Sequence, residues 1–345
     1  MERSLSKNAL LSVVFLLALS LSLGLFTTSE YVRARGIAYF EQGEQLRRHR
    51  AVLEGRAGNP WQYRVLAPYL IEQVMRLLAL LRVPRPVAVA FISFRVLQDT
   101  AVLFLAFYYY RRLGLSFFHA LVGMGLLAWS ISYSHYGSDL QFSTFFDLIF
   151  FLIAGLCLLS RRLWGVILVT FLAGLNRETS GLIPFLVLFH SVFAGNKRGA
   201  WREGLFVFFA SFATYISVFV GLRLLFGRQA LIVPYGHHPG ADLLRFNLWR
   251  LITWRQLLAT LNVVPIVAML AYHRWPRSLR VFFWTVVPVW VIVHALGAVV
   301  AETRLFLVPQ AMVFIPGALF GLGWQNDAFT GEAGTRLGAN GKEHA

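Results

Sequence analysis

Long apolar segments recur along the chain, separated by short polar connections. Ten of them approach the roughly 20 residues that a helix needs to cross the hydrocarbon core of a bilayer. We therefore predict an all-α, polytopic membrane protein with about ten transmembrane helices. The segment at 163–176 is short for a full crossing. The expected spans are 8–27, 87–110, 114–133, 140–160, 163–176, 179–195, 203–226, 253–272, 280–300 and 304–323.

Composition supports this class. Apolar residues make up 57% of the 345 residues and charged residues only 14%, whereas a soluble domain carries about 25% charged residues. The formal charge of +16 comes from arginines spread over many short loops, so it indicates membrane orientation and no nucleic-acid partner is expected. Cys157 is the only cysteine, which excludes an intramolecular disulfide and a cysteine-based zinc site.

The N-terminal segment has a basic start and a long apolar stretch, a pattern that signal peptides share. The apolar stretch is too long for a signal peptide, and the sequence "TTSEY" that follows it is a poor cleavage site. We interpret this segment as the first transmembrane helix.

The charges divide by side when the connections are alternated. Every short basic connection falls on one side, which the positive-inside rule assigns to the cytoplasm together with both termini. The other connections, 28–86, 134–139, 176–178, 227–252 and 301–303, are then extracytoplasmic. Ionisable groups at membrane helices are costly and indicate functional sites, although acids also end helices at any water interface. The acids of the apolar region gather on this outer side, and they are Glu30, Asp139, Glu178 and Glu302.

The chain is expected to form a single transmembrane domain, 1–323, in the plasma (inner) membrane. Its long first extracytoplasmic loop, 28–86, contains a helical stretch over 31–56 and an amphipathic segment over 65–82. That segment suits an interfacial helix; as an eleventh span it would reverse the sides of the later basic loops. A second outer loop covers 227–252, and the polar tail 324–345 is expected to be a disordered cytoplasmic segment.

Two polar motifs interrupt the apolar pattern on the outer side. The stretch "NPWQYRVLAPYL" at 59–70 carries Tyr63 and Arg64, where the guanidinium suits a phosphate and the aromatics equally suit an interfacial belt. Asn176, Arg177 and Glu178 lie between two short apolar segments. A polar group there must face protein or a water-filled cavity, as a binding site or merely as a helix cap.

A third motif, Glu302-Thr303-Arg304, repeats this theme at another outer helix end. Arg304 suits a phosphate or pyrophosphate, and the alternative is a structural pair of Glu302 with Arg304 or Arg177. Arg95 and Asp99 stand four residues apart, on one helix face, and are expected to form a buried structural pair.

Asp147 lies inside a span without an evident partner, so packing and catalysis are equally open for it. A metal site built from His135, His237 and His238 with Asp139 or Asp242 is a further alternative, but the spacing is not diagnostic. No metal is therefore assigned, although a divalent ion remains open. No phosphate loop or nucleophile elbow occurs, so no nucleotide cofactor is expected.

Taken in order, three elements resemble the GT-C superfamily of polytopic membrane glycosyltransferases, in particular a bacterial branch. These are a "YR-L-P" element after the first loop, here Tyr63 to Pro68, an "NRET" element, here 176–179, and an "E-R" element at 302–304. The resemblance covers residues 1 to about 323. It implies transfer of a sugar from a polyprenyl-phosphate carrier to an unidentified acceptor on the extracytoplasmic side of the cell envelope.

The resemblance also implies roles for residues. An acid just past the first helix would act as general base, by position Glu30, with Glu41 and Glu44 competing. Arg64, Arg177 and Arg304 would bind the phosphate. Tyr63 and Asn176 would help to bind the substrate, and the remaining outer acids, Glu178, Asp139 and Glu302, would meet sugar or acceptor hydroxyls.

One departure from the family and two other functions stay open. The family usually places Asp in the first loop, and residues 28–86 contain none. The alternatives to a glycosyltransferase are a transporter or flippase for a lipid-linked or anionic solute, and a non-catalytic subunit of a membrane complex.

Overall fold

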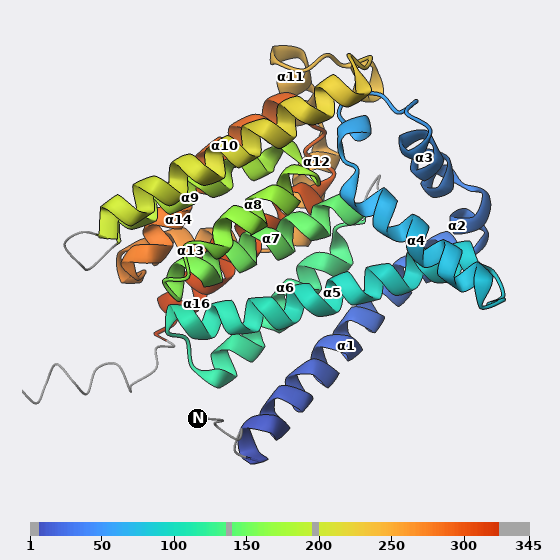
Figure 1. Cartoon of the computed structure of the whole chain (residues 1–345). Coiled ribbons are helices and arrows are strands. Elements are labelled where there is room, and N and C mark those ends of the chain that lie inside the picture. Colours follow the sequence, from blue (N-terminus) through green and yellow to red (C-terminus); the bar gives the residue numbers. More distant parts are fainter. Residues whose placement is uncertain (1–6, 136–139, 195–199, 324–345) are drawn as a thin grey trace, which may run out of the picture.

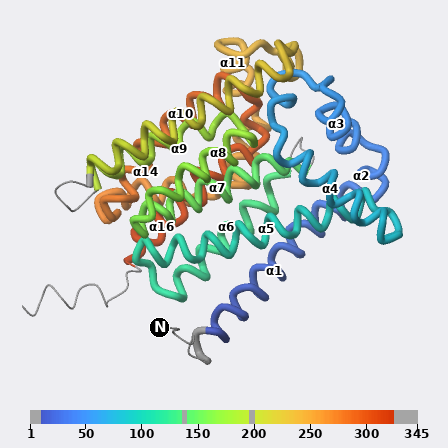
Figure 2. The backbone as a smooth tube through the Cα atoms, viewed as in Figure 1, coloured from blue at the N-terminus to red at the C-terminus, as the bar shows by residue number. Residues whose placement is uncertain are grey.

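The computed structural model describes residues 7–135, 140–194 and 200–323 (Figure 2). Helices account for 81% of it, and its described residues contain no strand. The predicted all-α class is therefore confirmed. In chain order the helices longer than one turn are α1 Lys7–Arg35, α2 Ala38–Gln42, α3 Glu44–Leu53, α4 Leu66–Leu80, α5 Pro86–Leu113, α6 Phe117–Tyr133, α7 Phe142–Leu159, α8 Gly165–Gly174, α9 Leu182–Phe193, α10 Ala200–Phe226, α11 Ala241–Trp249, α12 Leu251–Leu261, α13 Val264–Leu270, α14 Arg277–Gly297 and α16 Ile315–Gly321.

Short helical turns link these elements. Six are 3₁₀ or α turns, and one π-helical turn interrupts the last helical segment. They are η1 Trp61–Tyr63, η2 Glu178–Gly181, η3 Pro234–Gly236, η4 Tyr272–Arg274, η5 Thr303–Phe306, α15 Leu307–Pro309 and the π-turn η6 Gln310–Phe314.

Within the described residues, six helical segments are long and apolar enough to cross a membrane, or seven if α12 and α13, which meet at a 70° bend, count as one span. These helices indicate a membrane-embedded protein. The six are α1, α5, α7, α10, α14 and the segment Thr303–Gly321. The expected count of ten is not confirmed, because α6, α8 and α9 are apolar but shorter. At about 1.5 Å of rise per residue, the ten residues of α8 extend only about 15 Å.

Helix α5 packs against α1, α4, α6 and α7 (Figure 1). Buried aromatics fill this core and place their polar atoms on backbone carbonyls. Tyr109 donates to the Met312 carbonyl at 2.9 Å, and Trp275 donates to the Gly317 carbonyl at 3.1 Å. Such pairing is what a buried phenol or indole requires. It fixes the last helical segment against α5 and against the residue between η4 and α14.

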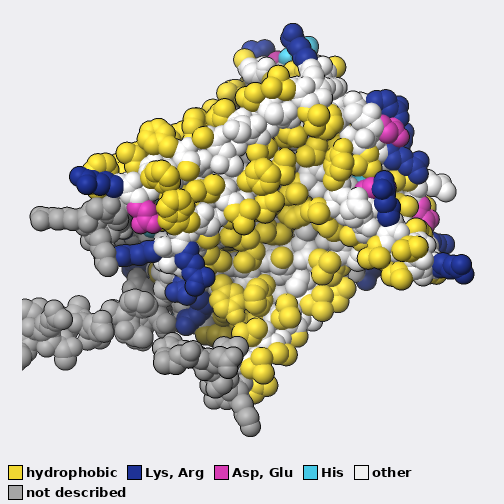
Figure 3. Space-filling model, in the orientation of Figure 1, with side chains coloured by type: hydrophobic (Ala, Val, Ile, Leu, Met, Phe, Trp, Pro, Cys, Tyr) yellow, Lys and Arg dark blue, Asp and Glu magenta, His cyan; other side chains and the backbone are white. Residues whose placement is uncertain are grey.

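The bundle has two distinct ends. We call the end that carries α2, α3 and α4 the loop end; α5 terminates at the opposite end, where α14 begins (Figure 1). Arg111 and Arg112 lie in the last turn of α5, and Arg277 begins α14. We call this opposite end the basic end. The space-filling view shows arginines gathered at both ends, with apolar side chains between them (Figure 3).

Helices α8 and α9 form a hairpin whose polar turn lies against α10. The Tyr215 hydroxyl of α10 donates to the Glu178 carbonyl at 3.0 Å, and a Cβ on Gly174 would touch Val218. From Tyr215, α10 continues 11 residues to Phe226, which is roughly 16 Å of helix. The turn is therefore recessed below the loop-end terminus of α10, and does not lie at its rim.

The segment around η1 closes over this recess. The Asn59 N–H donates to the Ala230 carbonyl at 2.8 Å, and the Tyr63 hydroxyl donates to the Gly227 carbonyl at 2.8 Å. At the start of α4, the Leu66 N–H donates to the Leu175 carbonyl at 3.1 Å. These bonds tie the first loop both to the segment after α10 and to the end of α8.

Candidate functional site

Three arginines from distant parts of the chain meet at the loop end. Arg64 follows η1, Arg177 precedes η2, and Arg304 lies in η5. Their side chains are 12%, 7% and 4% exposed, respectively. Arg177 interacts electrostatically with both of the others. We call Arg64, Arg177 and Arg304 the arginine cluster.

Each member of the arginine cluster has a carboxylate partner. Arg64 donates through Nε and Nη2 to one oxygen of Glu178, at 3.2 and 3.0 Å. Arg304, in η5, donates to Glu302, the residue that precedes η5. The sequence left pairing of Glu302 with either Arg304 or Arg177 open, and the structure selects Arg304. It also shows that Glu178 pairs with Arg64, which lies 114 positions away in the sequence.

The third partner is Asp147, whose carboxylate is 1% exposed. It accepts from Arg177 at 3.4 Å, from Asn176 at 2.9 Å and from Thr179 at 2.8 Å. Three of the four residues of the "NRET" motif therefore bond to the same carboxylate on α7. Sequence reasoning did not include Asp147 among the site residues, since its partners lie about 30 positions away.

Several polar atoms of the cluster stay without a partner among the described residues. They are buried Nε and Nη1 of Arg304, Nε of Arg177, Oε1 of Glu178 and Oδ1 of Asn176. A buried donor that makes no hydrogen bond costs about 1–3 kcal/mol, and such groups in native structures generally meet water or an ion. The three guanidinium nitrogens among them are donors that suit a phosphate oxygen, whereas Oε1 of Glu178 and Oδ1 of Asn176 are acceptors.

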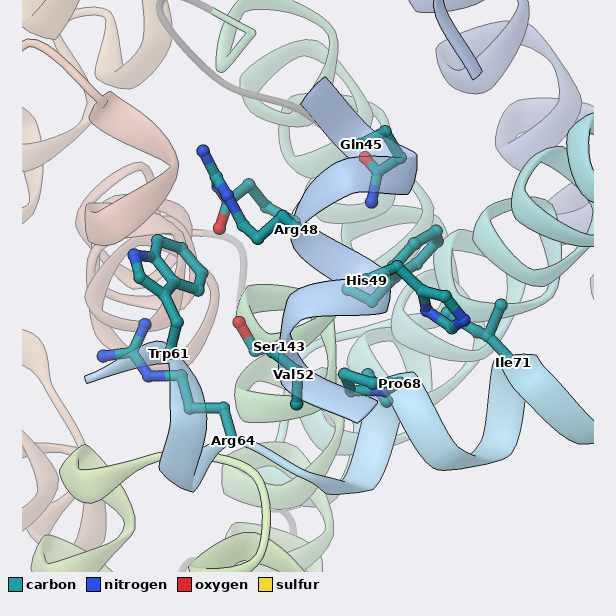
Figure 4. A pocket seen from close by; sticks show the side chains of 12 residues that line it. Gln45, Arg48, His49, Val52, Trp61, Arg64, Pro68, Ile71 and Ser143 are labelled. Atoms are coloured by element: carbon teal, nitrogen blue, oxygen red, sulfur yellow. The ribbon is translucent and has the colours of Figure 1, made fainter. Parts of the chain in front are cut away.

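A small cavity of about 50 Å³ opens beside Arg64 (Figure 4). That space exceeds the ~10–15 Å³ that a cavity needs to hold one water. Trp61 lies between two guanidinium groups, with Arg48 4.5 Å and Arg64 5.0 Å from its ring centre. Gln45, His49 and other polar residues complete the lining (Figure 4). The cavity thus presents cations and hydrogen-bonding groups together.

Tyr63 has a different place from the one expected. It is buried, its hydroxyl bonds to the segment after α10, and the Arg223 guanidinium lies 4.4 Å from its ring centre. Tyr63 does not line the cavity of about 50 Å³. Its geometry holds the first loop in position, which in turn orients Arg64.

The expected acids separate into three cases. Glu178 and Glu302 lie in the cluster as described above. Glu30, on α1, pairs with Arg33 at 2.8 Å and is 40% exposed. Asp139 lies outside the described residues. Glu178 is therefore the expected acid that combines proximity to arginines with a buried oxygen still free for a ligand.

A histidine that the sequence did not single out also belongs here. His294 of α14 is 3% exposed and interacts electrostatically with Arg177 and Arg64. Its Nδ1 bonds to the Trp290 carbonyl at 2.8 Å. A lone histidine on an apolar helix gives no sequence signal for this position.

The predicted Arg95–Asp99 pair is confirmed. Arg95 Nε donates to Asp99 at 2.9 Å, and both side chains are buried. Asp99 also accepts from Thr27 at 2.9 Å and from Thr28 at 3.2 Å, both on α1. The pair fastens α1 to α5, and Arg95 in turn interacts electrostatically with Arg304.

The histidines considered for a metal do not form one site. His237 bonds to Asp242 at 3.1 Å, and this bond, with the His238 backbone N–H, lowers the pKa of the exposed Asp242 carboxyl. His135 instead packs its ring against Tyr31. Over the described residues no group of three or more His, Cys, Asp or Glu side chains is placed to hold a metal ion.

Comparison of the chain with protein-family models, with curated proteins and with solved structures finds no match.

Proposed function

We propose that this protein is an integral membrane glycosyltransferase of the GT-C type, which moves a sugar from a polyprenyl-phosphate carrier to an acceptor on the extracytoplasmic side. The observation that carries the proposal is the arginine cluster. Arg304 retains two buried N–H groups and Arg177 retains one, all without partners among the described residues. A phosphate oxygen satisfies such donors and gains charge-assisted hydrogen bonds.

The topology follows from the same proposal. We place the loop end outside and the basic end in the cytoplasm, because short arginine-rich connections are retained on the cytoplasmic side. Both termini then face the cytoplasm. The short hairpin of α8 and α9 brings the polar turn below the end of α10, as irregular backbone at membrane depth is tolerated where protein surrounds it.

The chemistry assigns one step to each group. A carboxylate takes the proton of the acceptor hydroxyl, whose oxygen forms a bond to the anomeric carbon. The bond from that carbon to the carrier phosphate breaks, and both its electrons leave with the phosphate. Arg177 and Arg304 stabilise that leaving group electrostatically, and Arg64 lines the cavity of about 50 Å³ beside Trp61. We assign the base to Glu178, because it lies in the arginine cluster beside Arg64 and its buried Oε1 is unpartnered among the described residues.

The test is carrier binding by the purified full-length protein, measured by native mass spectrometry with a polyprenyl phosphate. Arg304→Ala and Arg64→Ala should each weaken binding at least tenfold relative to a phosphatidylglycerol reference. Arg33→Ala is the matched control, since Arg33 is 76% exposed and pairs with Glu30, and it should bind as the unmodified protein does. Equal binding by all four proteins, or no preference for polyprenyl phosphate over phosphatidylglycerol, contradicts the proposal.

A non-catalytic subunit is the second candidate, and one observation favours it. Glu178, Asp147 and Glu302 each pair with an arginine, as expected where polar clusters only hold helices together. The two functions differ in the same experiment: a subunit binds the carrier no better than phosphatidylglycerol, and its arginine variants change thermal stability alone.

A further inference from the structure

The cavity of about 50 Å³ beside Arg64 differs in charge from the arginine cluster. Arg48 and Arg64 line it, and none of the described residues in its wall is a carboxylate. We call it the Trp61 cavity, because that indole lies between the two guanidinium groups (Figure 4). A cleft walled by one sign of charge attracts the opposite sign, so this cavity favours an anion.

The carboxylate partners of these two arginines leave positive charge at the cavity. Glu44 pairs with Arg47 at 2.6 Å and lies 3.7 Å from Arg48, so two guanidinium groups share one negative charge. Glu178 accepts from Nε and Nη2 of Arg64, and Nη1 makes no hydrogen bond with the described residues. An anion can therefore bind beside both arginines of the wall without breaking an ion pair.

Two uncharged side chains of the wall, Gln45 and Ser143, add donors. Oε1 of Gln45 accepts from the Leu140 N–H at 2.8 Å, which leaves Nε2 as the donor side of that amide. The Ser143 hydroxyl lines the cavity and makes no hydrogen bond with the described residues. The cavity of about 50 Å³ is far smaller than the roughly 300–1,000 Å³ of sites for drug-sized ligands. It therefore suits one compact group with several acceptor oxygens, such as a phosphate.

The Trp61 cavity adjoins the arginine cluster. Arg64 belongs to both, and Arg177 interacts electrostatically with Arg64. The Ser143 carbonyl accepts from Asn176 at 2.8 Å, and Asn176 also bonds to the carboxylate partner of Arg177. A ligand bound at the arginine cluster therefore has a second set of donors beside it.

We propose that the Trp61 cavity binds a phosphate group, in addition to the phosphate assigned above to Arg177 and Arg304. The bound phosphate accepts from Arg48, from Nη1 of Arg64 and from the Ser143 hydroxyl. Two sources supply this chemistry: the second phosphate of a polyprenyl diphosphate, or a phosphate carried by the acceptor. The identity of the source rests on the proposed function, whereas the phosphate subsite itself does not.

Inorganic phosphate tests the subsite without a lipid. Its binding to the purified full-length protein is measured by isothermal titration calorimetry in a nonionic detergent. Arg48→Gln should weaken one bound phosphate by about tenfold or more, the worth of one charge-assisted hydrogen bond. Arg47→Gln is the matched control, because Arg47 is the preceding residue of α3, also pairs with Glu44 and is absent from the wall. It should bind phosphate as the unmodified protein does.

Two carriers distinguish the sources in native mass spectrometry. A phosphate that belongs to the carrier makes polyprenyl diphosphate bind about tenfold more tightly than polyprenyl monophosphate, and Ser143→Ala should reduce that ratio. A phosphate that belongs to the acceptor leaves the two carriers equal, and inorganic phosphate should then still bind to the protein loaded with the monophosphate.

The outcomes for the two proposals are separate. Arg304→Ala should weaken both carriers and leave the phosphate that depends on Arg48 in place. Failure of both carriers to bind contradicts the proposed function, and the calorimetry with inorganic phosphate still decides the subsite. Phosphate binding that survives Arg48→Gln, or that Arg47→Gln weakens to the same extent, overturns the subsite.

Discussion

Removing the carboxylate of Asp147 is the sharpest perturbation of the candidate site. Asp147→Leu keeps a side chain of similar shape but leaves Arg177, 7% exposed, without its ion-pair partner. Breaking a buried pair from one side costs about 3–5 kcal/mol, because a buried charge is left uncompensated. Asn176 and Thr179 lose the same acceptor. We therefore take about 3 kcal/mol as the smallest expected loss.

The loss translates into a thermal shift. A domain of 150–250 residues shifts by about 2–4 °C per kcal/mol, and this chain is larger, so the lower figure applies. Asp147→Leu should lower the apparent unfolding midpoint by roughly 6–10 °C. The ten tryptophans of the chain provide the fluorescence signal. Scan rate and lipid must be identical for all variants, because unfolding of such proteins is commonly irreversible.

A double-mutant cycle separates the ion pair from general damage. Arg177→Met alone leaves Asp147 buried and unpaired, so it should destabilise by a similar amount. The double variant Asp147→Leu/Arg177→Met should be more stable than the sum of the two single losses, by about 0.5–3 kcal/mol for residues in one network. An Asp147→Leu midpoint within 2 °C of the unmodified protein, or strictly additive losses, refutes the reasoning.

Three further predictions concern the frame around the site. Gly123→Ala should destabilise by about 1–3 kcal/mol, because a Cβ there would lie 2.7 Å from a tyrosine ring of α5, whereas Gly125→Ala on the same helix meets open space and should be neutral or stabilising in the same thermal assay. Thr27→Val removes one of the two threonine hydrogen bonds to the buried carboxylate at the α1–α5 contact, and should lower stability by about 1–3 kcal/mol, with an unchanged midpoint contradicting that role. Burial lowers the pKa of His49 below its ordinary 6.5, and although burial alone would raise the pKa of Glu72, its hydrogen bonds with Arg76 and His49 outweigh that effect and lower it. The unfolded loop therefore binds more protons, and stability of the α3–α4 contact is fully present above pH 6.5 and falls below it. The protection factors of α3 amides, which are corrected for the intrinsic pH dependence of exchange, should fall as the pH drops below 6.5, and His49→Gln should remove the upper part of that change.

The sequence predicted local features well. All ten apolar segments coincide with helical regions, because the apolar pattern depends on neighbouring residues. The Arg95–Asp99 pair was found from a spacing of four, which places both side chains on one helix face. The number of crossings was not predictable in this way. An apolar segment such as α8 satisfies the pattern but has only ten residues in helical form.

The pairs between residues far apart in the chain could not be predicted from the sequence. Arg64 and Glu178 are 114 positions apart, and nothing in either motif names the other. Asp147 carries no local sign of its three partners. Glu30 was selected for its place after the first helix, yet its local surroundings supply Arg33 at a spacing of three. Position along the chain identified which end of the bundle holds the polar groups, but not which of them meet.

Each acid of the cluster pairs with an arginine. Arg177 and Arg304 nevertheless keep N–H groups that could bind a further acceptor. Arg304 uses Nη2 on Glu302 and keeps Nε and Nη1, so an anion can bind without breaking the ion pair. The carboxylates then fix the guanidinium planes, as preorganised electrostatic sites require. Both carboxylate oxygens of Asp147 accept hydrogen bonds, Oδ1 from Asn176 and Oδ2 from Thr179. Glu178 spends one oxygen on Arg64 and keeps the other, which makes it the cluster acid with a buried, unpartnered oxygen for a proton or a hydroxyl.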